Sequence, residues 1–152
     1  MIDIRDSEIS RHLLEIGEYE YQEMLQWFEH LSIPSNLKKL IDIGANIGTT
    51  AIPMALDKRF VKIFSFEPDP YNYSMLDFNI KRNGLCNRII PENIAIGDRD
   101  GCIPFELSPS NFGDHRVRYQ ENKTMYNHAV TQISELFKRY AGDSWCNLLL
   151  IP

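Results

Sequence analysis

Residues Leu40–Gly48 read LIDIGANIG, and residues Ile63–Pro70 read IFSFEPDP. In each stretch a run of apolar, strand-forming residues leads to an acidic residue, which is Asp42 in the first and Glu67 in the second. A glycine-bearing turn follows the first run. In parallel α/β proteins this strand–turn–helix pattern places a ligand at the carboxyl ends of the strands, over the helix N-terminus. The pattern is typical of a βαβ unit that binds an adenosine-bearing ligand.

The spacing within these stretches suits a nucleoside. Gly44 and Gly48 have no Cβ, so the backbone can approach a ligand closely there. Asn46 stands where many nucleotide sites have a glycine, and asparagine tolerates a left-handed backbone. Glu67 lies 19 residues after Gly48, close to the spacing of about 20 at which an acid binds ribose hydroxyls. A lone Asp-x-Gly turn is more often structural, and Glu67 in this position is what favours a ligand site.

The chemistry of the turn bears on which adenosine ligand would bind. NAD sites prefer Gly-x-Gly-x-x-Gly, in which glycines let a pyrophosphate sit on the helix end. Here the turn is poor in glycine, and a carboxylate at Asp42 would repel a diphosphate. A carboxylate better suits a cationic amino-acid head, as in S-adenosylmethionine. The sequence also has no Gly-Lys-Ser/Thr phosphate loop, which disfavours ATP. An NAD-dependent oxidoreductase remains a less favoured alternative.

Composition limits the other function classes. The chain has 152 residues, 43% hydrophobic residues and a net charge of −5, which suits a globular domain without the basic footprint of a nucleic-acid or membrane-surface protein. Its three cysteines have no paired spacing, so no metal site is expected. No apolar run approaches the roughly 20 residues of a membrane span, and the first residues lack signal-peptide features. We therefore expect a cytoplasmic protein.

Hydrophobic periodicity predicts helices alternating with strands, which is typical of a parallel α/β sheet. The predicted helices are two amphipathic helices over Ile9–Leu31 that are interrupted near Gly17, one over Gly48–Leu56 that starts late or is kinked at Pro53, one from Pro70 to Asn83 with Asp69 as N-cap, and one over Ile133–Tyr140 with Thr131 as cap. The predicted strands are Leu37–Ile43, Val61–Phe66, Arg88–Ile96 and Trp145–Ile151, with a hairpin turn at Asp98–Gly101 leading into Cys102–Leu107 and a polar loop over Ser108–Asn122. We divide the chain into a helical lead-in, residues 1–36, and a Rossmann-like domain, residues 37–152.

Several ordered motifs resemble the FkbM family of S-adenosylmethionine-dependent methyltransferases. They are DSEISRHLLEIGEYE (residues 6–20), DIGANIGTT (42–50), FEPDPYNYSMLDFNIKRNGL (66–85), NIAIGDRDG (93–101) and LSPSNFGDHRV (107–117). The resemblance runs over nearly the whole chain. It implies a Rossmann-like class I methyltransferase fold without a metal. It also implies methyl transfer from S-adenosylmethionine, usually to a hydroxyl of a sugar or other small metabolite.

The resemblance also assigns roles to residues. Asp42, Gly44, Asn46 and Gly48 would shape the methionine end of the cofactor site, Glu67 would hold the ribose, Pro68 and Asp69 would line the same edge, and Asn93–Ala95 would meet the adenine. Helix capping explains Asp69 at least as well as ligand contact. Asp114 or His115 could act as a base toward the acceptor, although a solvated loop is the better explanation of that stretch.

The end of the chain departs from the family pattern. In the family the fourth strand ends Leu-Leu-Lys-Ile-Asp or similar and continues Val-Glu-Gly, whereas here LLLI is followed by Pro152. We therefore expect a truncated methyltransferase that lacks the C-terminal strands. An unpaired apolar edge on its last strand would favour pairing with a second copy. A non-catalytic remnant that only binds the cofactor is the alternative.

Overall fold

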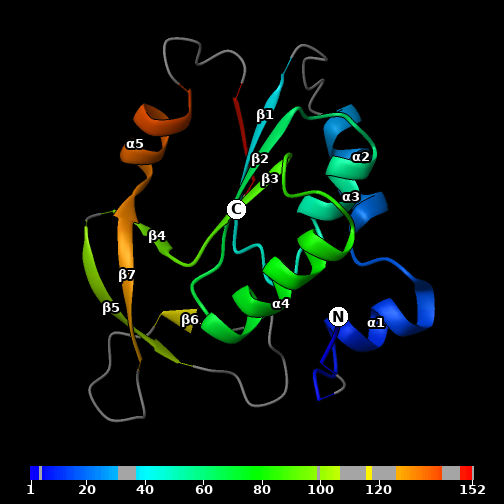
Figure 1. Cartoon of the computed structure of the whole chain (residues 1–152), viewed down its shortest axis with the longest axis horizontal. Helices are drawn as coiled ribbons and strands as arrows, with labels where there is room; N and C mark the ends of the chain where they lie inside the picture. The colour runs from blue at the N-terminus through cyan, green and yellow to red at the C-terminus, as the bar shows by residue number, and fades with distance from the viewer. Residues whose placement is uncertain are drawn as a thin grey trace.

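The computed structural model describes residues 1–3, 5–30, 37–98, 100–106, 116–117, 126–141 and 148–151. Two four-stranded sheets and the helices packed on them make up this part of the chain. Helices α1 to α4 lie on one side of the first sheet, and α5 and the second sheet lie on the other (Figure 1).

The first sheet is entirely parallel. Its strands, in spatial order, are β3 (Ile89–Glu92), β2 (Lys62–Phe66), β1 (Lys39–Ile43) and β8 (Leu148–Ile151). Numbered along the sheet this is the order 3-2-1-4, which is the beginning of the doubly wound Rossmann arrangement. The predicted α/β fold with four parallel core strands is therefore confirmed.

Helices bury one face of this sheet. They are α2 (Tyr21–His30), α3 (Ala51–Leu56) and α4 (Pro70–Arg82), and α1 (Ile9–Ile16) precedes them along the chain. The core on this face combines side chains of the helices and strands, namely Phe28, Leu40, Met54, Ile63 and Leu76, with Phe60 from the connection between α3 and β2. Burying such side chains contributes about 1.5–3 kcal/mol each.

The opposite face is covered by α5 (Ile133–Leu136) and the π-helical segment η1 (Phe137–Ala141). Leu136 packs on Ile41, Phe64 and Phe66, and the ring of Tyr140 stacks on that of Phe64 with centroids 4.0 Å apart. Both faces are thus buried, which explains why the strands of this sheet read as nearly continuous apolar runs.

Capping residues fix the helix ends where the sequence predicts them. The Asp69 carboxylate accepts a hydrogen bond of 2.8 Å from the backbone N–H of Asn72 at the start of α4. At the other end the chain leaves the helix through Asn83, and Gly84 adopts a left-handed φ of +68°. Gly17, at φ +92°, ends α1 in the same way. The interruption predicted near Gly17 and the cap predicted at Asp69 are both confirmed.

The second sheet corrects two predictions. Its strands, in spatial order, are β4 (Ala95–Gly97), β7 (Tyr126–Gln132), β5 (Gly101–Glu106) and β6 (Arg116–Val117). The strand predicted over Arg88–Ile96 is wrong, because β3 and β4 belong to different sheets. Asn93 lies between them, and its amide donates to the carbonyls of Glu67 and Pro68 at the end of the first sheet.

The predicted hairpin is also wrong. β4 and β5 are consecutive in the chain, but β7 lies between them, parallel to β4 and antiparallel to β5. Thr131 belongs to β7 and does not cap α5. The division of the chain at residue 36 stays a prediction, since residues 31–36 lie outside the described ranges. Within those ranges no helix is both long and apolar enough to cross a bilayer.

Candidate functional site

The turn after β1 contains three residues with left-handed backbone geometry. They are Gly44 at φ +80°, Asn46 at φ +50° and Gly48 at φ +96°. The N–H groups of Gly44 and Ala45 both donate to the carbonyl of Phe66, at 2.9 and 3.0 Å. The turn is therefore folded against the end of β2, at the carboxyl edge of the sheet.

The two glycines of the turn have different surroundings. A Cβ at Gly48 would lie 2.8 Å from Cδ1 of Ile52 and 3.0 Å from Cδ1 of Leu76, whereas a Cβ at Gly44 would meet nothing within 4 Å. Gly48 thus lets α3 and α4 pack closely against the turn, which is the role of the last glycine in dinucleotide folds. Gly44 is exposed, so the open backbone available to a ligand is at Gly44.

Asp42 and Glu67 lie on the same face of the sheet, at the ends of the adjacent strands β1 and β2. Asp42 is paired with Ser65 in the register of β1 and β2, and Glu67 follows Ser65 by two residues, so its side chain points to the same side. Both carboxylates are buried, with 3% and 4% of their surface exposed. Two buried acids so close together need either protons or a ligand.

Glu67 joins the turn to the segment after β2. Its Oε2 accepts a hydrogen bond from the backbone N–H of Asn46, and its Oε1 accepts one from Asp69, both at 2.8 Å. The side-chain Oδ1 of Asn46 accepts from the N–H of Ile47 at 2.7 Å. Each carboxylate oxygen has a second lone pair, so Glu67 can hold the turn and still accept a ligand hydroxyl.

Asp42 has weaker contacts. Its Oδ2 accepts a long hydrogen bond of 3.4 Å from the hydroxyl of Ser65. Burial raises the pKa of Asp42 to about 7, and the Ser65 hydroxyl opposes this only in part. Burial also raises the pKa of Glu67 to about 7, aided by the charges of Asp69 and Asp42 and opposed by the two backbone N–H groups. A bound cation or hydroxyl donor would favour the ionised form of both groups.

The remaining predicted site residues divide into three groups. Pro68 and Asn93 lie at the same edge, since the Asn93 amide donates to the Glu67 and Pro68 carbonyls at 2.7 and 2.9 Å. Ala95 is buried in β4 of the second sheet. Asp114 and His115 lie outside the described residues.

Sequence reasoning missed two residues that support the site. Ser65 contacts Asp42, and it could have been found as a polar residue in an apolar strand, two positions before Glu67. Asn79 on α4 donates its side-chain amide to the carbonyl of Ile47 at 2.9 Å. Only the packing of α4 against the turn reveals Asn79, because nothing local in the sequence marks it.

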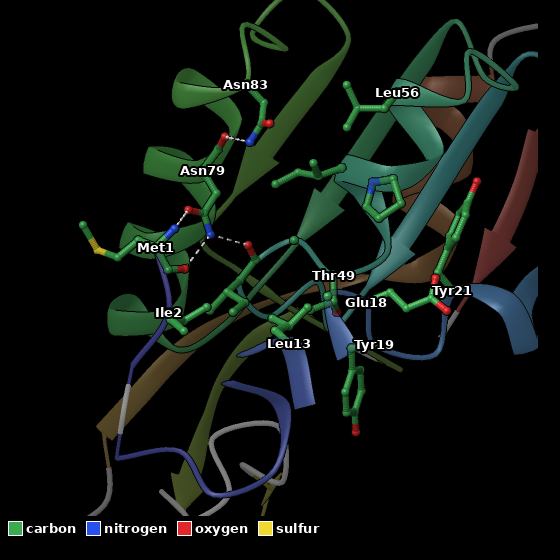
Figure 2. A pocket seen from close by; sticks show the side chains of 15 residues that line it. Met1, Ile2, Leu13, Glu18, Tyr19, Tyr21, Thr49, Leu56, Asn79 and Asn83 are labelled. Carbon is green, nitrogen blue, oxygen red and sulfur yellow. Dashed lines mark hydrogen bonds between the residues drawn. The ribbon is translucent and has the colours of Figure 1, made fainter. Parts of the chain in front are cut away.

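A cavity of about 450 Å³ lies behind the turn. Figure 2 shows it between the N-terminal residues, α3 and α4, with Met1, Leu13, Tyr19, Tyr21 and Asn79 around it. Ile47 and Gly48 line it, but Asp42 and Glu67 do not. The cavity is therefore separate from the carboxylate edge and shares only the back of the turn with it.

No protein-family model matches the chain. The chain is similar to the methyltransferase sdnD of Sordaria araneosa, with 26% identity over 116 residues, which are 75% of this chain and 44% of that protein. It thus spans less than half the length of this curated relative.

Solved structures of methyltransferases are also similar. The methyltransferase FkbM from Methylobacillus flagellatus KT is 20% identical with a TM-score of 0.45, over 67% of this chain and 23% of that chain. TYW2 of M. jannaschii, solved in complex with AdoMet, is 28% identical with a TM-score of 0.36, over 50% of this chain and 35% of that chain. The strand order of this chain itself defines its fold class.

Proposed function

We propose that this chain is the S-adenosylmethionine-binding part of an FkbM-type methyltransferase that acts on a hydroxyl of a sugar or other small metabolite. The observation that carries the proposal is the pair of buried carboxylates, Asp42 and Glu67, on one face of the sheet beside the open backbone of Gly44. The similarity to a curated methyltransferase supports the same activity.

The charges of the site favour this cofactor over a dinucleotide. Asp42 would face the cationic methionine end, where a positive charge offsets the cost of ionising a buried carboxylate. Glu67 would accept the ribose hydroxyls with the lone pairs that Asn46 and Asp69 leave open. A pyrophosphate at the turn would meet the carboxylate of Asp42, which disfavours NAD.

The transfer itself asks mainly for alignment. A C–O bond forms between the methyl group and the acceptor oxygen while the C–S bond breaks. The electron pair stays on sulfur, and the hydroxyl proton passes to a base. Holding the two reactants in line supplies much of the acceleration. Asp114 and His115 remain proposals for the base.

Calorimetric titration with S-adenosylhomocysteine, compared with NAD at the same concentration, tests the cofactor. We expect saturable binding of S-adenosylhomocysteine and none of NAD. Binding of NAD without binding of S-adenosylhomocysteine would overturn the proposal. The variant Asp77→Asn should bind S-adenosylhomocysteine as tightly as the wild type, because Asp77 lies on α4 and pairs with Lys81 away from the turn.

Binding and catalysis can be separated in the same preparation. Labelled S-adenosylmethionine is incubated with a panel of hydroxylated sugars and small metabolites, and transfer of the label is measured. Transfer of the label to an acceptor supports a catalytic methyltransferase. Cofactor binding without transfer to any acceptor supports a non-catalytic cofactor-binding protein.

Strand β8 forms one edge of the first sheet among the described strands. An open strand edge can pair with another chain, so we propose a homodimer formed through β8. Light scattering at increasing protein concentration should show a mass of twice 17.7 kDa. A constant monomer mass would exclude the dimer.

A further inference from the structure

We propose that Asn79 is a positioning residue. It fixes the turn after β1 on the side that faces away from Asp42 and Glu67, so that nucleoside affinity depends on a side chain outside the ligand site. This proposal rests on the proposed function for its affinity measurement. Its second measurement, the mobility of the turn, is independent of any ligand.

The hydrogen bonds of Asn79 point to this role. Its amide nitrogen donates to the carbonyl of Ile47 at 2.9 Å and to the carbonyl of Met1 at 3.0 Å, and its amide oxygen accepts from the backbone nitrogen of Met1. Figure 2 shows these bonds converging on Asn79 at the wall of the cavity. Asn79 is 7% exposed, so water does not readily replace them.

The contact with Ile47 is a contact with the turn itself. Ile47 precedes Gly48, and its side chain is buried against Ile9 of α1 and Met75 of α4. Leu76, one helical turn before Asn79, reaches the space beside Gly48 that a Cβ would fill. Three side chains of α4, those of Met75, Leu76 and Asn79, therefore contact two consecutive residues of the turn.

The front of the turn is held by other groups. Glu67 accepts from the N–H of Asn46, and Phe66 accepts from those of Gly44 and Ala45. These bonds face the carboxylate edge, whereas Asn79 acts on the opposite side. The turn is thus held on both sides, and only the front is shared with the ligand.

Asn79→Asp tests the proposal because it keeps the shape of the side chain but removes both amide donors. Asn83→Asp is the matched control, since Asn83 lies one helical turn later and its amide donates to the backbone carbonyl of Asn79 rather than to the turn. Calorimetry gives the dissociation constant for S-adenosylhomocysteine. Hydrogen exchange of the peptide covering residues 40–50 gives the mobility of the turn without ligand.

We expect Asn79→Asp to weaken S-adenosylhomocysteine at least about tenfold and to speed exchange in residues 40–50, while Asn83→Asp changes both by less than about twofold. An unchanged dissociation constant in folded Asn79→Asp protein would overturn the proposal. If Asn79→Asp does not fold, Asn79→Ser replaces it with the same two outcomes. If the wild-type chain does not bind S-adenosylhomocysteine, the proposed function fails, and the exchange measurement alone decides the role of Asn79.

Discussion

The ends of β1 and β2 each carry one buried carboxylate, but the two ends are built differently. Glu67, after β2, accepts hydrogen bonds of 2.8 Å from two backbone N–H groups. Asp42, on β1, accepts one hydrogen bond among the described residues, a long one of 3.4 Å from the Ser65 hydroxyl. Burial raises the pKa of both to about 7.

Because of this difference, the two acids have different effects on the stability of the fold. Glu67 satisfies two backbone donors that would otherwise be buried without an acceptor, so the fold needs it with or without a ligand. Asp42 adds a buried charge with little compensation, which costs stability. A ligand that pairs with Asp42 explains why such a residue is present.

Glu67→Ala should give the largest effect. It leaves the N–H groups of Asn46 and Asp69 without their acceptor, so the free energy of unfolding should fall by about 2–4 kcal/mol. S-adenosylhomocysteine should bind at least about 100-fold more weakly. Urea unfolding and calorimetry measure the two changes. Glu29→Ala, at an exposed position of α2, is the control, and an unfolding midpoint equal to that of the wild type would contradict the role given to Glu67.

Asp42→Asn should weaken ligand binding without lowering the stability of the fold. Removing the buried carboxylate should leave the free energy of unfolding at pH 8 unchanged or raise it by about 1 kcal/mol. The affinity for S-adenosylhomocysteine should fall about tenfold, or about 1.4 kcal/mol. A loss of stability as large as that of Glu67→Ala would show that the two ends do not differ as described.

The pH dependence of stability follows from the two raised pKa values. Between the ordinary pKa values of 3.8 and 4.5 and the folded values of about 7, the folded protein holds protons that the unfolded chain has released. The stabilisation from these groups is therefore complete below about pH 4 and is lost as the pH rises toward and through 7.

Urea unfolding at pH 6 and pH 8 measures this loss. Each group should lower the free energy of unfolding by about 1 kcal/mol over this interval. The free energy of unfolding of Asp42→Asn should therefore fall about half as much as that of the wild type. S-adenosylhomocysteine affinity should change in the opposite direction and rise with pH, because the ligand favours the ionised carboxylates. An equal stability at both pH values would contradict the raised pKa values.

Asp69→Ala should give the smallest effect. It removes the cap of α4, which lowers the free energy of unfolding by about 1 kcal/mol, but it keeps the backbone N–H that Glu67 accepts. Nucleoside affinity should change by less than about threefold. Ser74→Ala, an exposed hydroxyl on the same helix, is the control in both urea unfolding and calorimetry. A large loss of affinity would instead assign Asp69 to ligand contact.

Sequence reasoning worked where local signals coincide with the fold. Asp69 and Pro70 mark the start of α4, and Asn83 and Gly84 mark its end, because caps act within a few residues. The positions of Asp42 and Glu67 follow from two apolar strands and the edge at which parallel strands end. These local signals place Asp42 and Glu67 without knowledge of the rest of the fold.

Predictions from the sequence failed where pairing between distant strands decides the structure. β7 was missed because nothing local marks Tyr126–Gln132 as a strand that enters between β4 and β5. The break at Asn93 depends on carbonyls of Glu67 and Pro68, about 25 residues earlier, which accept its amide. Asn79 was missed for the same reason, since its partner Ile47 lies on another element.

The pairing of β8 with β1 has a consequence during translation. Leu148 lies opposite Lys39, so a ribosome must add 109 further residues after Lys39 before this edge of β1 gains its neighbour. At about 5–20 residues per second this takes on the order of 10 s. Throughout that time the nascent chain presents the unpaired backbone edge of Lys39–Ile43, which makes it a candidate for chaperone capture until β8 emerges.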